Sequence, residues 1–285
     1  MKNIEVFKND CYKINLINTT NNPLLKSINH VFILTMENSN NLKSRQLELF
    51  ELGKNTYIQY NKGYQNCNKN VKINNTNLDI VDAYKNICEF NINNNENIII
   101  LEDDAFIINF DKKIYNEIND FIQNNNFDIY SFASGGLFNK FGNTNHKKIL
   151  FRGLSYNNNI ILPFWGLQAA IWSAKTRAKI INLNYDVIIN NYNIDTNLIY
   201  NNNLNVYIYK QPLIVQAFNM TENSKNWDPT FGYGYNFLKI NKENLNNLNK
   251  GWNKLYFYNF NIIYIILIII ILIILIICFA NNLFH

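Results

Sequence analysis

Residues 98–106 have the sequence IIILEDDAF, in which four apolar residues are followed directly by three carboxylates. The apolar run predicts a short strand that is buried on both faces, because a half-buried strand would alternate apolar and polar residues. Glu102, Asp103 and Asp104 would then stand at its carboxyl end, where open α/β sheets bind their ligands. Neighbouring carboxylates repel one another unless a cation or a ligand's hydrogen bonds neutralise them. Because oxygen ligands favour Mg²⁺ or Mn²⁺, the pattern predicts a metal–phosphate site, and the alternative is an acidic loop that caps the next helix.

Strands and helices are expected to alternate on both sides of this run. The predicted strands cover residues 31–36, 56–60 and 127–132, and the predicted helices cover residues 41–52, 77–90 and 111–122. This alternation predicts a three-layer α/β domain with a mostly parallel central sheet flanked by helices.

The second half of the chain has a more mixed pattern. Short apolar stretches at 149–151 and 159–162 are expected to pair as a hairpin, and residues 168–172 are expected to form another buried strand. A helix is predicted over 174–183, with Arg177 on its surface, and closing strands at 206–209 and 213–216.

Composition and charge exclude some classes of function. The chain has 285 residues and a formal net charge of +5, with its lysines scattered along the sequence. Asparagine makes up roughly a fifth of it, far above average usage. No dense basic block with interleaved aromatic residues is present, so no nucleic-acid partner is expected.

Four cysteines occur, and none of them has C-x-x-C spacing. Neither a zinc site nor a redox pair is therefore predicted. A reducing compartment is the simplest interpretation of this cysteine usage.

Residues 262–280 are continuously apolar and contain no charge. Nineteen helical residues span roughly 28 Å, about the thickness of a bilayer core, so a single transmembrane helix is predicted. Aromatic residues precede it, and lysines lie on its amino-terminal side but not after it. The pattern predicts a C-terminal tail anchor in a membrane, with the main domain on the cytosolic side.

Further candidate site residues follow predicted strands or start predicted helices. Asn38 follows the first strand, and Arg45, one to two helical turns later, could pair with a diphosphate or simply be solvated. Gly136 would permit close approach of the backbone to a ligand, or form a simple turn. Asp195 begins a late predicted helix, where it could serve catalysis or act as an N-cap.

The order of these pieces resembles glycosyltransferase family 25, which includes the lipopolysaccharide and collagen galactosyltransferases. The resemblance rests on Asn38 and Arg45, the strand that ends in Glu102-Asp103-Asp104, the segment 165–170, Asp195, and the strand 212–216. It covers roughly residues 31–227, and the asparagine-rich composition is similar to members encoded by large DNA viruses.

The resemblance implies a GT-A-like fold, here over residues 30–240. An N-terminal extension (1–29) would precede it, and a juxtamembrane linker (241–261) would lead to the transmembrane helix. It also implies a nucleotide-sugar donor, commonly UDP-linked, and Mn²⁺ (or Mg²⁺) that joins the donor to the protein. Asp104 would be the direct metal ligand, with Glu102 near the ribose or the metal's waters.

The remaining roles follow from the same resemblance. Arg45 would face the nucleotide, and Asp195 would activate the acceptor or bind the sugar, because a carboxylate can deprotonate an acceptor hydroxyl held in line. The expected activity is therefore metal-dependent transfer of a hexose, such as galactose or glucose, to a hydroxyl of a glycan or protein, with inversion. Two alternatives stay open: a non-catalytic, membrane-anchored binding protein of the same fold, and another metal–phosphate enzyme such as a nucleotidyltransferase.

Overall fold

The computed structural model describes most of the first 216 residues and one later helix. The described ranges are 4–39, 47–90, 95–107, 111–132, 137–138, 145–151, 155–156, 159–160, 169–185, 204–209, 213–216 and 267–274. The chain divides into two compact units, Met1–Ile240 and Asn241–His285.

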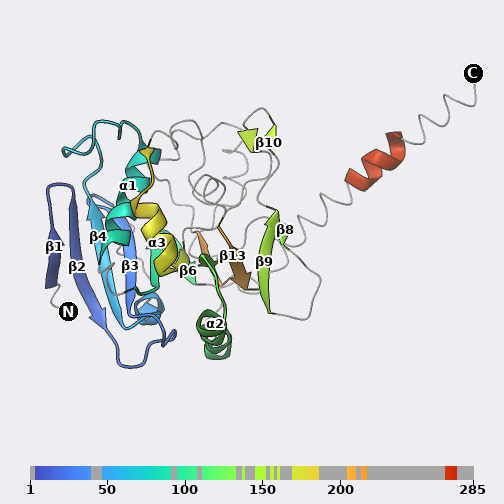
Figure 1. Ribbon diagram of the computed structural model, residues 1–285, viewed down its shortest axis with the longest axis horizontal. Coiled ribbons are helices and arrows are strands. Elements are labelled where there is room, and N and C mark those ends of the chain that lie inside the picture. Colours follow the sequence, from blue (N-terminus) through green and yellow to red (C-terminus); the bar gives the residue numbers. More distant parts are fainter. Residues whose placement is uncertain are drawn as a thin grey trace, which may run out of the picture. The chain divides into compact units, whose positions relative to one another are not determined.

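The first unit is built on a ten-stranded mixed sheet (Figure 1). Its strands, in spatial order, are β1 (Ile4–Lys8), β2 (Tyr12–Thr19), β4 (Asn55–Asn61), β3 (His30–Met36), β5 (Ile98–Glu102), β12 (Ala169–Trp172), β7 (Ile129–Ser131), β13 (Val206–Tyr209), β9 (His146–Phe151) and β8 (Leu137–Phe138). Two small antiparallel pairs accompany it, β10 (Ser155–Tyr156) with β11 (Asn159–Ile160), and β6 (Ala105–Ile107) with β14 (Ile214–Gln216).

Helices cover both faces of this sheet, which gives three layers. Helices α1 (Thr76–Glu89) and α3 (Ala174–Ile181) pack on the face that carries Phe32, Ile98 and Ile100. The 3₁₀ helix η2 (Leu47–Glu51) and helix α2 (Lys112–Asn124) pack on the face that carries Ile99 and Leu101. Strand β5 is thus covered on both sides, which is why its four leading residues are all apolar. The buried strand predicted from residues 98–101 is confirmed.

The prediction of a mostly parallel sheet is wrong. Three of the nine strand pairings in the described sheet are parallel, namely β3 with β4, β3 with β5, and β7 with β13. Strand β12 inserts between β5 and β7 and runs against both of them. A fully buried strand reads as a continuous apolar run in either direction, so its sequence does not reveal its orientation.

The first two strands form a hairpin that extends the sheet beyond β4, and a disulfide ties this hairpin to a distant loop. Cys11, in the hairpin turn, is bonded to Cys67, which lies 56 residues further on and follows β4. Their Cα atoms are 5.4 Å apart. The sequence, which predicted neither a redox pair nor a zinc site and was interpreted as that of a protein in a reducing compartment, did not indicate this disulfide, since a pairing over this separation depends on the fold and not on local spacing.

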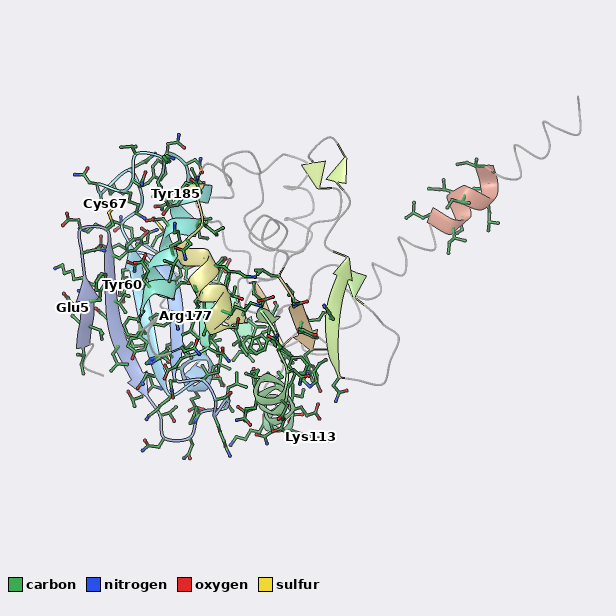
Figure 2. All side chains as sticks on the ribbon, in the orientation of Figure 1. Glu5, Tyr60, Cys67, Lys113, Arg177 and Tyr185 are labelled. Carbon is green, nitrogen blue, oxygen red and sulfur yellow. A yellow bond between two sulfur atoms is a disulfide. The ribbon has the colours of Figure 1, made fainter. Side chains whose placement is uncertain are left out.

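The prediction that Arg177 lies on the surface of its helix is wrong. Arg177 of α3 is fully buried (Figure 2). Its guanidinium donates to the carbonyl oxygens of Cys88, Phe90 and Glu96. Two of these carbonyls lie at the carboxyl end of α1, where the last turn of a helix leaves its acceptors without intrahelical partners. Arg177 therefore joins α3 to α1, and its burial lowers the pKa of the guanidinium.

Two smaller predictions also differ from the structure. Among the described strands, β9 pairs with β8 and β13, whereas β11 pairs with β10; residues 161–162 of the predicted hairpin lie outside the described ranges. The described part of the predicted helix 41–52 is the 3₁₀ helix η2, while residues 40–46 lie outside the described ranges.

The transmembrane prediction is contradicted by the described residues. Of the predicted span 262–280, the structure describes a helix over 267–274. Among the residues that the structure describes, no helix is both long and apolar enough for a membrane crossing. The tail anchor, the membrane as a partner and the cytosolic placement that followed from them are therefore withdrawn.

Candidate functional site

The three carboxylates lie where the main sheet gives way to the small sheet of β6 and β14. Glu102 ends β5, Asp103 and Asp104 form a turn, and Ala105 begins β6. Glu102 and Asp103 are partly exposed, whereas Asp104 is 5% exposed. The buried strand therefore delivers two of its three acids to a position that a ligand can reach.

Asp103 is held by two hydroxyl groups from the end of β3 and the turn that follows it. The Thr35 and Ser39 hydroxyls each donate to Asp103 Oδ2 over 2.6 Å. Thr35 is 3% exposed, so this contact lies within the sheet and not on its surface. Charge-assisted hydrogen bonds of this kind fix the carboxylate in one orientation across the ends of two neighbouring strands.

Glu102 is held by the helix on the other side. The Tyr84 hydroxyl of α1 donates to Glu102 Oε1 over 3.0 Å. Tyr84 is 2% exposed, and its ring packs against Trp172 of β12, with centroids 5.4 Å apart. The packing of α1 against the sheet thereby determines where this carboxylate points.

The site coincides with a reversal of strand order. Strand β3 has β4 on one side and β5 on the other, and all three run parallel. Their carboxyl ends therefore meet at one edge, and the chain leaves β3 toward β4 before it returns to β5. Open α/β sheets bind ligands in the crevice at such a switch point. Asp103, Thr35 and Ser39 lie directly on it.

The described residues do not support the prediction of a metal ion at the acidic cluster. Within the described ranges, no group of three or more His, Cys, Asp or Glu side chains is arranged to hold a metal ion. Asp103 accepts from two hydroxyls and Glu102 from a third, so hydrogen bonds meet part of the charge of these two carboxylates. Asp104, the predicted direct ligand, is buried beside them. Among the described residues no site for Mn²⁺ or Mg²⁺ is found, and the prediction of metal binding by Glu102 and Asp104 is withdrawn.

The remaining predicted site residues divide into two groups. Asn38 is exposed in the turn between Met36 and Ser39, beside the acidic cluster. Arg45, Gly136 and Asp195 lie outside the described ranges. The structure therefore brings together Asn38, Glu102, Asp103 and Asp104, and leaves the other three as predictions.

Sequence reasoning missed the three hydroxyl groups that orient the carboxylates. Thr35 is the only hydroxyl residue in the apolar run 31–36, and a polar residue at the end of a buried strand needs a hydrogen-bond partner. That signal was available for Thr35. Tyr84 has the helical spacing of a core residue, and nothing local distinguishes its hydroxyl as a partner of Glu102.

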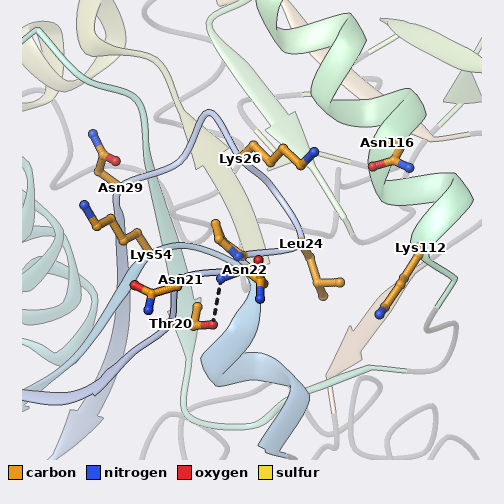
Figure 3. Close-up of a pocket in the computed structure, with 10 residues that line it drawn as sticks. Thr20, Asn21, Asn22, Leu24, Lys26, Asn29, Lys54, Lys112 and Asn116 are labelled. Carbon is orange, nitrogen blue, oxygen red and sulfur yellow. Dashed lines mark hydrogen bonds between the residues drawn. The ribbon is translucent and has the colours of Figure 1, made fainter.

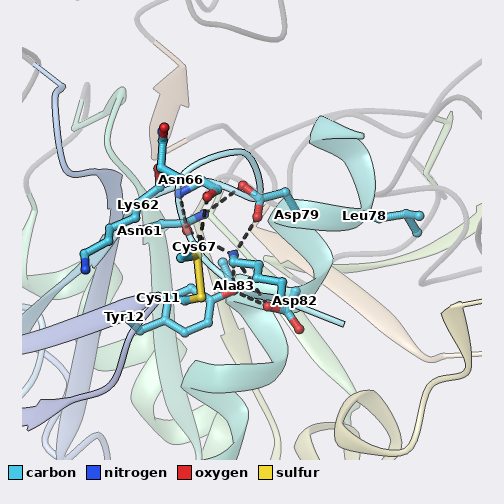
Figure 4. A network of polar contacts seen from close by, with 12 residues as sticks. Cys11, Tyr12, Asn61, Lys62, Asn66, Cys67, Leu78, Asp79, Asp82 and Ala83 are labelled. Carbon is cyan, nitrogen blue, oxygen red and sulfur yellow. Dashed lines mark hydrogen bonds and ion pairs between the residues drawn. A yellow bond between two sulfur atoms is a disulfide. The ribbon is translucent and has the colours of Figure 1, made fainter. Parts of the chain in front are cut away.

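A second polar network lies at the end of the neighbouring strand β4 (Figure 4). Lys69, whose side chain is 3% exposed, donates to Asp79 Oδ1 over 2.5 Å and to Asn61 Oδ1 over 3.0 Å. Asp82 accepts hydrogen bonds from the hydroxyls of Tyr12 and Tyr185. Burial, followed by the charge of Asp82, raises the pKa of Tyr12 well above its usual range.

This network joins the loop after β4 to α1 and β2, next to the disulfide. Its charged groups are paired with one another, so it supports the edge of the sheet and does not present groups to a ligand.

Comparison with known proteins adds little to this geometry. No family model matches the chain, and no curated protein matches it. Among solved structures, the chain is similar to the crystal structure of A197 from STIV, at 12% identity and a TM-score of 0.35, over 64% of this chain and 81% of that one. A likeness this weak carries no argument about fold or function.

Proposed function

We propose that this chain is a glycosyltransferase that binds a nucleotide-sugar at the carboxyl ends of β3 and β5. The observation that carries the proposal is the pair of hydroxyl–carboxylate bonds that hold Asp103 at the switch point of the sheet. A carboxylate accepts hydrogen bonds and donates none, so it selects ligands rich in hydroxyl donors. The ribose and hexose of a nucleotide-sugar are such ligands.

In this proposal, Glu102 and Asp103 bind the hydroxyls of the ribose and the hexose. Both are partly exposed, and both are oriented by buried partners on separate elements. Fixed acceptors of this kind hold a donor in one geometry and reduce the entropy lost in the reaction. Asn38, exposed in the turn after β3, adds an amide that can both donate and accept at the same edge.

The resemblance to family 25 supplies the finer part of the proposal. It favours a UDP-linked hexose as donor and a hydroxyl of a glycan or protein as acceptor. Asp195 stays the candidate for deprotonating that hydroxyl, and Arg45 the candidate for the diphosphate. No step is assigned to a metal ion.

Two measurements on the full chain test the proposal. The first is binding of UDP and UDP-hexoses, in EDTA and then with added Mn²⁺. The second is release of UDP from UDP-hexoses in the presence of a panel of glycan and peptide acceptors. Asp103→Asn should weaken nucleotide-sugar binding at least about tenfold, because the loss of one charged hydrogen-bond acceptor costs about 1.5–3 kcal/mol. Asp120→Asn is the matched control, since Asp120 is exposed on α2. It should leave binding unchanged.

Three outcomes decide between the proposed transferase and its alternative, a non-catalytic binding protein. Saturable binding with turnover supports a transferase, and binding without turnover under any acceptor supports a non-catalytic binding protein. The proposal fails if neither UDP nor a UDP-hexose binds, or if Asp103→Asn and Asp120→Asn behave alike.

A further inference from the structure

A hollow at the opposite end of the parallel strands gathers positive charge. It has a volume of about 580 Å³, and its lining includes the lysines Lys26, Lys54 and Lys112 (Figure 3). Four amide residues, Asn21, Asn22, Asn29 and Asn116, also line it, and none of the ten described residues that line it is Asp or Glu. The volume is that of a small-molecule site. Because three lysines and four amides line it and no carboxylate does so among the described residues, the hollow suits an anionic ligand that also carries hydrogen-bonding groups.

The three lysines come from segments that are far apart in sequence but fixed to one another. Lys54 is held through its backbone, since its N–H donates to Ile28 O over 3.0 Å and its carbonyl accepts from Thr20 N–H over 2.9 Å. The loop that carries Lys26 is tied to α2, because the Ser27 N–H and hydroxyl both donate to Asn119 Oδ1, over 3.1 and 2.8 Å. Helix α2 carries Lys112 in its first turn. The hollow is thus framed by hydrogen-bonded segments.

The charge of these lysines is not balanced within the described part of the protein. None of the three forms an ion pair there. Carboxylate residues of neighbouring segments do not line the hollow: Glu51, whose carbonyl oxygen accepts from the Leu24 N–H, Glu96, which accepts from the Asn29 amide and pairs with His30, and Asp111, which caps α2 through the Lys113 N–H. Like charges held around one hollow repel one another unless an anion lies between them.

We propose that this hollow is a second binding site, for a small ligand that carries phosphate groups. Lysine ammonium groups bind phosphates as point charges, and the neighbouring amides can bind hydroxyls or bridging oxygens. Several lysines around one hollow suit a polyanion better than a single carboxylate.

This site is separate from the strand-end site. Asn29 and Lys54 immediately precede the parallel strands β3 and β4, whereas Asp103 contacts the other end of β3. The seven residues of β3, at about 3.3 Å each, place roughly 20 Å between the two sites. The inference therefore stands or falls independently of the proposed function.

Calorimetric titration of the full chain with pyrophosphate at low salt tests the inference, with inorganic phosphate, glucose 6-phosphate and glucose as further probes. We expect saturable binding of one pyrophosphate at the hollow, weaker binding of inorganic phosphate and none of glucose. Tighter binding of glucose 6-phosphate than of inorganic phosphate would identify a phosphorylated sugar, and the reverse would identify a free polyphosphate. Added salt should weaken every anionic probe, because the lysines are exposed.

Single variants locate the binding. Lys26→Gln, Lys54→Gln and Lys112→Gln should each weaken pyrophosphate binding about fivefold, the contribution of one exposed ion pair. Lys113→Gln is the matched control, because Lys113 is the next residue of α2, is exposed and does not line the hollow. It should change the affinity less than twofold.

Three results would overturn the inference. The first is the absence of saturable pyrophosphate binding. The second is an equal loss of affinity in Lys113→Gln and Lys112→Gln, which would indicate a diffuse charge effect. The third is loss of binding in Asp103→Asn while the three lysine variants still bind, which would move the anion to the strand-end site.

Discussion

Replacement of Lys69 by methionine should be one of the most destabilising single changes in this protein. Methionine keeps most of the apolar stem but removes the ammonium group, which lies 2.5 Å from Asp79 Oδ1 and 3.5 Å from Asp82 Oδ2. The side chains of Lys69 and Asp79 are 3% and 7% exposed, so water cannot replace the lost partner. Removal of one member of a buried ion pair costs about 3–5 kcal/mol, because the other charge is left uncompensated.

Further contacts of the ammonium group add to this cost. Lys69 also lies 4.2 Å from the centroid of the Tyr12 ring and donates to Asn61. After the substitution, Asp79 Oδ2 keeps the hydrogen bond from the Asn61 amide, which is 3.0 Å long. The expected loss is therefore about 4 kcal/mol, a large part of the 5–15 kcal/mol by which a domain is ordinarily stable.

Urea unfolding followed by tryptophan fluorescence measures this loss, and a double-mutant cycle assigns it. Asp79→Asn removes the other charge, so Lys69→Met combined with Asp79→Asn should be less destabilised than the sum of the single changes by about 1–3 kcal/mol. Lys175→Met is the control, since the Lys175 side chain is 63% exposed and should change stability by less than about 0.5 kcal/mol. A loss below about 1 kcal/mol for Lys69→Met, or strict additivity with Asp79→Asn, would refute the argument.

Three other predictions concern the cysteines and a histidine. Peptide mapping without reduction should recover Cys11 linked to Cys67, and recovery of both as free thiols would contradict the pairing. Replacing both by serine should lower the free energy of unfolding by about 4 kcal/mol, the chain-entropy value for a separation of 56 residues. Burial raises the pKa of Cys88 to about 12, so a thiol reagent at pH near 8 should modify Cys88 only after unfolding, and rapid modification of the folded protein would show that it is accessible. Burial lowers the pKa of His146 from 6.5, so below that pH the unfolded chain binds a proton that the folded chain does not, and stability should fall as the pH drops below about 6.5. His146→Phe should reduce that fall in urea midpoints, whereas an equal fall in both proteins would exclude His146 as its source.

Local sequence predicted the elements that bear on the candidate site. The run 98–101 predicted a buried strand, and β5 is buried on both faces. The helical spacing of residues 77–90 predicted α1, which the structure places at Thr76–Glu89. Apolar runs and helical periodicity report burial over a few residues, and this is why they succeed here. The acidic cluster was placed at the end of β5 by the same reasoning.

Contacts between distant segments were beyond that reasoning. Thr35 and Ser39 meet Asp103 across more than 60 positions, and Arg177 reaches the end of α1 from 87 to 89 positions away. The prediction of a metal site failed for the same reason. The sequence of the acidic run did not indicate that hydroxyls from β3 and α1 would donate hydrogen bonds to two of its carboxylates. The direction of β12 is likewise absent from its apolar run.

The sequence by itself determined that residues 98–104 form a buried strand with carboxylates at its end, because apolar patterning and chain order are local properties. The tertiary structure alone decided which groups meet those carboxylates, how Lys69 and Arg177 come to be buried, and where three lysines gather around one hollow. Each of these depends on where the fold brings distant segments together, and the free energy of a polar or charged group is set by the partners that it meets there.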